Sequence, residues 1–235
     1  MRCLLTGIEG KGVKAHIIPR SFYDLDYLQP LEIITNSETG YNGKSFVGIY
    51  DKNIVTAEGE RIFSPWDLYA HQLLISGCDS FEKIVLDGKV IALRTPSYHY
   101  SNLKLFFISV LWRASVSTHP FFQHIRIDTF EPILRNALLN ADSGGKEFFS
   151  VTLAYFVDLP TKTVMMDPLK EQYENVVYFR FFLGQYIAYI KVDQNPTPTL
   201  FEPYALSPDR PLVIIGREFH HSKEKSVVRN LVMGR

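Results

Sequence analysis

The hydrophobic and polar positions change in pattern along the chain. Residues 1 to about 63 contain short apolar runs, such as VKAHIIP and FVGIY, separated by Gly, Asn and Pro. This pattern predicts short strands joined by long loops. From residue 64 the apolar residues recur at helical spacing, and Ser64 and Pro65 have the residue types favoured at an N-cap and at the first helical position. We therefore expect a helix from 65 to about 76.

The middle of the chain predicts a hairpin followed by two helices. Two apolar runs between 83 and 94 flank Asp87-Gly88, a strong signal for a two-residue hairpin turn. Residues 101–117 are apolar on nearly every side, so we expect a helix in the interior of the protein. The segment 130–145 predicts a third helix that ends at Gly144.

After residue 146 the pattern is that of a sheet. The runs FFSVTLAYFV, NVVYFRFFLG, QYIAYIKVD and PLVIIGREF are rich in aromatic and β-branched residues. QYIAYIKV alternates, which predicts one solvent-facing side. The closing segment, HHSKEKSVVRNLVMGR, predicts a short basic helix. We expect an α+β fold whose body, residues 79–235, contains a central apolar helix (101–117) and a mainly antiparallel sheet (147–217).

Charge and composition limit the classes of function. The chain has 25 basic and 25 acidic residues, whereas a protein that binds nucleic acid mainly through its phosphates is usually basic. Binding of nucleic acid would therefore need a local basic patch or a partner that supplies the charge. Its two cysteines exclude a disulfide framework and an all-cysteine zinc site built by one chain. The apolar run LKLFFISVLW is shorter than a membrane span. We expect a cytoplasmic protein with no membrane association.

Candidate chemistry lies in the first third of the chain. Cys3 with Thr6-Gly7, the run KAHIIPRSF, the run YDKNIVTAEGE and the run DLYAHQLL occur in that order. Together they resemble the HNH, or ββα-metal, endonuclease family over residues 3 to about 75. The resemblance implies a small ββα module at residues 1–78. His16 matches the family's first histidine, Asn53 its asparagine, and Glu60 the position of its last histidine or another metal ligand.

The resemblance implies metal-dependent cleavage of phosphodiester bonds. A neutral imidazole such as that of His16 suits a general base, and Asn53 would hold the strand that bears it. A divalent cation, Mg²⁺ or Mn²⁺, would stabilise the leaving oxygen. Its candidate ligands are His16, Glu60 and Asp51. The alternatives without a catalytic role are a structural histidine at His16, a turn residue at Asn53 and a solvated carboxylate at Glu60.

Several residues depart from the family's pattern. Ala15 stands where many members have an acidic metal ligand. Many members also have two Cys-x-x-Cys pairs that hold a structural zinc. Here Cys3 is the only cysteine that remains of them, and Thr56 and Gly59 occupy the positions of the second pair. We therefore expect no structural zinc. Arg113 lies at the end of the apolar helix. Its guanidinium is expected to form a structural ion pair, and the functional alternative is a contact with phosphate. A pairing of His71 with Asp67 is expected on the first helix.

Two hypotheses for the function follow. The first is a divergent HNH-like nuclease, or a nuclease-derived subunit, of the kind found in bacterial or phage defence and mobile-element systems. It would act on nucleic acid and work with a protein partner or as a homo-oligomer. The second is a catalytically inactive scaffold, adaptor or sensor subunit that binds a protein partner.

Overall fold

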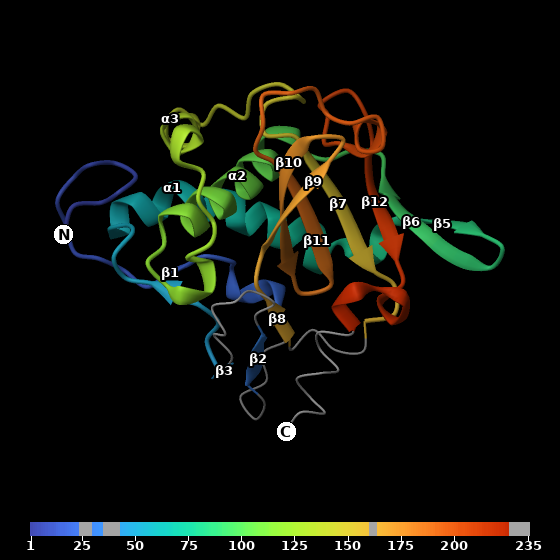
Figure 1. The fold of residues 1–235 in the computed structure, drawn as a ribbon, viewed down its shortest axis with the longest axis horizontal. Helices are drawn as coiled ribbons and strands as arrows, with labels where there is room; N and C mark the ends of the chain where they lie inside the picture. The colour runs from blue at the N-terminus through green and yellow to red at the C-terminus, as the bar shows by residue number, and fades with distance from the viewer. Residues whose placement is uncertain (24–29, 35–42, 160–163, 226–235) are drawn as a thin grey trace.

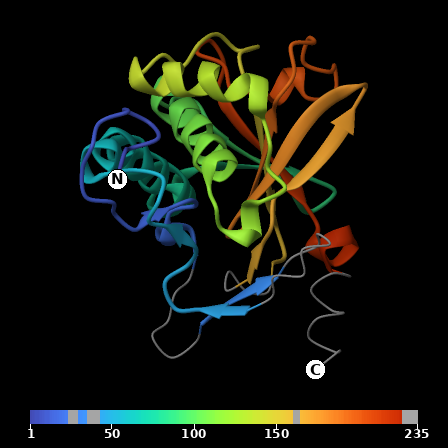
Figure 2. The same ribbon diagram turned by 60° about the vertical axis from the view of Figure 1, so that its left-hand side comes forward.

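The computed structural model describes residues 1–23, 30–34, 43–159 and 164–225. These residues form a mixed α+β fold, as predicted, in which three α-helices lie on one side of a large sheet (Figures 1 and 2). The helices are α1 (Ala57–His71), α2 (Tyr100–Val116) and α3 (Glu131–Leu139).

The large sheet has seven strands in the order β5-β6-β12-β7-β11-β10-β9. They are β5 (Glu82–Leu86), β6 (Lys89–Thr95), β7 (Val151–Phe156), β9 (Leu169–Tyr173), β10 (Val176–Leu183), β11 (Tyr186–Lys191) and β12 (Leu212–Arg217). All neighbours are antiparallel except β12 and β7, which are parallel, so the expectation of a mainly antiparallel sheet is confirmed. The sheet extends beyond the predicted range because the hairpin β5–β6 joins it through β12.

Smaller pairings lie beside the large sheet. Strand β1 (Ala15–His16) pairs with β4 (Tyr50–Asp51), and α1 follows β4 directly along the chain. Strand β2 (Leu31–Ile34) pairs with β3 (Gly43–Ser45) and, in parallel, with β8 (Val164–Met166). The last pairing connects the first third of the chain to its second half.

Helix α2 lies in the centre of the molecule, where its apolar sequence predicts it. Nearly all of its residues are buried, including the polar Lys104, Ser109 and Arg113. The imidazole of His99 caps its first turn by accepting a hydrogen bond from the backbone N–H of Asn102. The predicted hairpin turn is also confirmed, since Asp87 and Gly88 both have positive φ.

Two predicted helix boundaries are wrong. Helix α1 begins at Ala57, after Thr56, because the polar segment AEGE supplies a first turn in which acidic residues are favourable. Ser64 lies inside the helix, where its hydroxyl donates to the carbonyl of Glu60, and Pro65 is also internal. Helix α3 ends at Leu139, before Gly144. Most of the predicted C-terminal basic helix lies outside the described residues.

Two apolar cores fill the two faces of the large sheet. The larger core joins residues from both sides of the predicted boundary at 78, such as Ile17 and Phe63 with Phe106 and Trp112. The smaller core, on the other face, includes Phe201. Because both faces are covered, β11 is buried along its whole length, and the predicted solvent-facing side is wrong. Among the described residues, none of the helices combines the length and apolar character needed to cross a bilayer.

Candidate functional site

His16 lies on β1 with its ring fixed by a backbone contact. Its Nε2 is 2.8 Å from the carbonyl oxygen of Val47. Because a carbonyl only accepts, Nε2 carries the proton, and in the neutral ring Nδ1 keeps the lone pair. Burial lowers the pKa of His16 below its usual value, the bond to Val47 opposes this, and the charge of Arg113 lowers it further. The ring is therefore neutral near pH 7, which suits a base.

Arg113 is a buried connector between α2, α1 and β1. Its guanidinium forms a two-pronged ion pair with Asp67, at 2.8 Å and 3.0 Å, and donates to the carbonyl of His16 at 2.8 Å. The ion-pair interpretation of Arg113 is thus confirmed. The predicted pairing of His71 with Asp67 is wrong: among the described residues Asp67 pairs with Arg113, and no contact joins it to His71. Arg113 became a candidate only as a charge at the end of an apolar helix, and no sequence pattern indicated its partners.

Glu60 lies in the first turn of α1 and is half-buried. Its Oε2 is shielded from solvent and, within the described part of the chain, accepts no hydrogen bond. Burial raises the pKa of Glu60, while the charges of Arg113 and Asp67 act in opposite directions on it. The same two charges act on His16. The charges of the Arg113–Asp67 pair therefore act on both Glu60 and His16.

Asp51 and Asn53 are linked to each other and to the residues that follow α2. One carboxylate oxygen of Asp51 accepts the backbone N–H of Asn53 at 2.8 Å. The other accepts the hydroxyl of Ser117 and both the N–H and the hydroxyl of Thr118, at 2.7–3.0 Å. Burial alone would raise the pKa of Asp51, but these bonds hold it below its usual value. Asn53 is exposed and contributes its backbone to this turn, as a plain turn residue does.

Thr6 and the positions expected to match the second cysteine pair, Thr56 and Gly59, are gathered around the thiol of Cys3. The sulfur of buried Cys3 accepts the N–H of Thr6 at 3.5 Å. Burial alone would raise the pKa of Cys3, but hydrogen bonds from Thr6 and from the backbone of Thr56 hold it below its usual value. A Cβ atom built on Gly59 would lie only 2.7 Å from the sulfur of Cys3. Cys3, Thr6, Thr56 and Gly59 are therefore neighbours in space.

The described ranges contain no group of three or more His, Cys, Asp or Glu side chains arranged to hold a metal ion. Comparisons of the chain with models of protein families, with curated proteins and with solved structures found no match.

Proposed function

We propose that residues 1–78 form a divergent HNH-like ββα module and that the protein is a metal-dependent endonuclease, or a subunit derived from one. The main support is that, in the order β1–β4–α1, His16 on the first strand and Glu60 on the first turn of the helix are both influenced by the charges of one Arg113–Asp67 pair, whose arginine also donates to the carbonyl of His16. The gathering of Thr56 and Gly59, the positions that match the family's second cysteine pair, around Cys3 adds to this support.

His16 is the general base of the proposed reaction. Its Nδ1 lone pair takes the proton from the attacking water as the water approaches the phosphorus atom. The bond from Nε2–H to the carbonyl of Val47 fixes the ring and stabilises the imidazolium that forms. Arg113 holds the backbone of the same residue through the His16 carbonyl. Both contacts orient the base without occupying its lone pair.

Glu60 is the residue that fits a divalent cation. Its unpartnered, shielded oxygen is a hard donor, and Mg²⁺ commonly binds through one or two carboxylates with water in its other positions. When bound, the cation supplies charge stabilisation at the leaving oxygen. Asp51 does not fit this role, because hydrogen bonds from its neighbours occupy both of its oxygens.

The test is cleavage of plasmid DNA and of structured RNA in the presence of Mg²⁺ or Mn²⁺. His16→Ala should lower the rate by about 10²- to 10⁴-fold, the usual contribution of a general base. Glu60→Gln should raise the metal concentration needed for half-maximal activity. His71→Ala, a change of another half-buried histidine, is the matched control and should cleave normally. Equal rates for wild type and His16→Ala would refute the catalytic role.

A second candidate, an inactive scaffold or sensor that binds a protein partner, is supported by the same contacts taken as purely structural. The buried Arg113–Asp67 pair and the contacts of Cys3 hold the module together without the family's metal-binding cysteines, so the module is stabilised whether or not it is active. Protection of bacterial cells from phage that is equal in wild type and His16→Ala would support the scaffold function over the nuclease. Protection lost only in His16→Ala supports the nuclease.

A further inference from the structure

A pocket lies on the face of the large sheet that the helices do not cover. Its volume is about 550 Å³, within the usual range for sites that bind small molecules. Its lining comes from β5, β6, β7, β9, β11 and β12 and from the segment around Phe201. Neither His16 nor Glu60 lines it, so the pocket is separate from the proposed nuclease site.

Small side chains on the strands create the floor of the pocket. Ile215 of β12 lies opposite Ala92 on β6 and beside Ala154 on β7, so a row across three strands alternates small, large and small. All three residues line the pocket. Two alanines in place of the larger residues usual on a covered sheet face leave the space that a ligand needs.

Aromatic rings form the wall. Phe201 lies edge-on to Tyr173, with 4.9 Å between ring centroids, and it tilts against Tyr189 at 5.4 Å. Rings arranged in this way favour a flat aromatic guest, which can meet their edges and faces together. At the entrance, Leu200 is 63% exposed and Ile91 is 41% exposed, so a bound molecule would also cover apolar surface that water now contacts.

Among the described residues, one that lines the pocket carries a shielded hydroxyl without a hydrogen-bond partner. Thr152 is 1% exposed, and its hydroxyl makes no hydrogen bond to any residue that the structure describes. It lies opposite Tyr189 in the β7–β11 ladder. A buried hydroxyl without a partner costs free energy that a ligand's polar group would recover. The nearby charge of Arg217 is already matched by the hydroxyl of Tyr189 at 2.8 Å and by Glu224 at 3.5 Å, which favours a neutral ligand.

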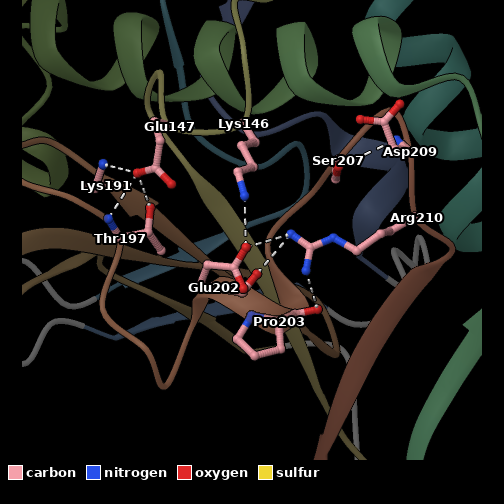
Figure 3. A network of polar contacts seen from close by, with 9 residues as sticks. All are labelled: Lys146, Glu147, Lys191, Thr197, Glu202, Pro203, Ser207, Asp209 and Arg210. Atoms are coloured by element: carbon pink, nitrogen blue, oxygen red, sulfur yellow. Dashed lines mark hydrogen bonds and ion pairs between the residues drawn. The ribbon is translucent and has the colours of Figure 1, made fainter.

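The side of the pocket formed by the segment around Phe201 is held in place by polar contacts (Figure 3). Glu147 accepts hydrogen bonds from Lys191 and from both the N–H and the hydroxyl of Thr197, at 2.7–2.9 Å. Glu202 accepts from Lys146 at 2.9 Å and from Arg210 at 3.1 Å. These contacts fix the segment on both sides of Phe201, so the pocket is formed before a ligand arrives, which lowers the cost of binding.

We propose that this pocket binds a small, neutral, planar aromatic molecule that carries one hydroxyl or carbonyl group. The aromatic part lies over Ala92 and Ala154 and against Phe201, and the polar group exchanges a hydrogen bond with Thr152.

The experiment compares 1-naphthol with naphthalene by isothermal titration calorimetry on the full chain. 1-Naphthol should bind at one molecule per chain and roughly fivefold more tightly than naphthalene, as one net hydrogen bond predicts. Thr152→Val keeps the shape of the side chain and should abolish this preference while leaving naphthalene binding unchanged. Leu200→Asp, at the exposed entrance, should weaken both ligands at least fivefold.

Ser150→Ala provides the matched control. Ser150 is also buried, its hydroxyl also lacks a partner among the described residues, and it does not line the pocket. This variant should bind both ligands as wild type does. The proposal is overturned if neither ligand binds saturably to wild type, or if the preference for 1-naphthol persists in Thr152→Val.

Discussion

Gly59→Ala sets two opposing effects against each other in α1. Alanine is favoured over glycine inside a helix by about 1 kcal/mol, so an ordinary exposed site would be stabilised. Here the new Cβ would lie 2.7 Å from the sulfur of Cys3 and 3.1 Å from Cβ of Val55. Optimal contacts between such atoms are roughly 3.5–4.0 Å, so the overlap with the sulfur approaches 1 Å.

Overpacking of this kind costs about 1–3 kcal/mol, which exceeds the helical gain. We therefore expect Gly59→Ala to lower the free energy of unfolding by about 1 kcal/mol. Removing the sulfur of Cys3 should reverse the sign of the effect of Gly59→Ala on the free energy of unfolding. Cys3→Ala alone loses about 1 kcal/mol of burial, but in that background Gly59→Ala should be neutral or stabilising. The coupling between the two sites is then about 1–2 kcal/mol, above the error of a double-mutant cycle.

Urea unfolding followed by tryptophan fluorescence provides the measurement, since Trp66 and Trp112 are both buried. Gly145→Ala is the matched control, because its added Cβ would meet no atom within 4 Å, and it should be neutral or slightly stabilising. If Gly59→Ala stabilises the protein as much as the control does, and shows no coupling to Cys3, the packing of Gly59 against the thiol is refuted.

Three further substitutions test buried charges by chemical denaturation. Arg113→Met should lower the free energy of unfolding by about 3–5 kcal/mol, because Asp67 and the carbonyl of His16 lose their partner. A decrease of less than about 1 kcal/mol would contradict this. The pKa of Asp51 is lowered, so its stabilisation is complete above about pH 4 and lost as pH falls through its folded pKa; the deficit of Asp51→Asn should disappear in that acidic window. Burial, with the nearby charge of Lys191, lowers the pKa of Lys104 to about 7, so the unfolded chain binds more protons from there to about pH 10. Wild-type stability should rise with pH by at most about 1.4 kcal/mol per unit in that window, and Lys104→Met should abolish the slope.

Local signals predicted the parts of the fold that depend on neighbouring residues. The hairpin at Asp87-Gly88 and the buried helix α2 follow from turn chemistry and from an apolar run. The start of α1 was misplaced because two valid N-terminal signals occur, one at Thr56 and one at Ser64. The burial of β11 was missed because its cover includes Phe201, which lies outside the strands that pair with it.

The surroundings of His16 could not be predicted in the same way. Its carbonyl is bonded by Arg113, 97 residues later, and Arg113 in turn pairs with Asp67, 46 residues away. Hydrophobic periodicity shows which face of a helix is buried, but it does not show which polar groups meet inside. The candidate residues were therefore identified from a motif, whereas their charges and hydrogen bonds emerge only from tertiary packing.

These long-range contacts explain how the proposed module can stay rigid without zinc. Arg113, near the end of α2, holds β1 through the carbonyl of His16 and α1 through Asp67. Ser117 and Thr118, just beyond α2, hold β4 through Asp51. Strands β1 and β4 and helix α1 are thus all hydrogen-bonded to residues at the C-terminal end of α2, which holds the three elements together. We therefore expect residues 1–78 alone to lose the contacts that hold β1, β4 and α1 in place, so that cleavage by the proposed site would require the whole chain.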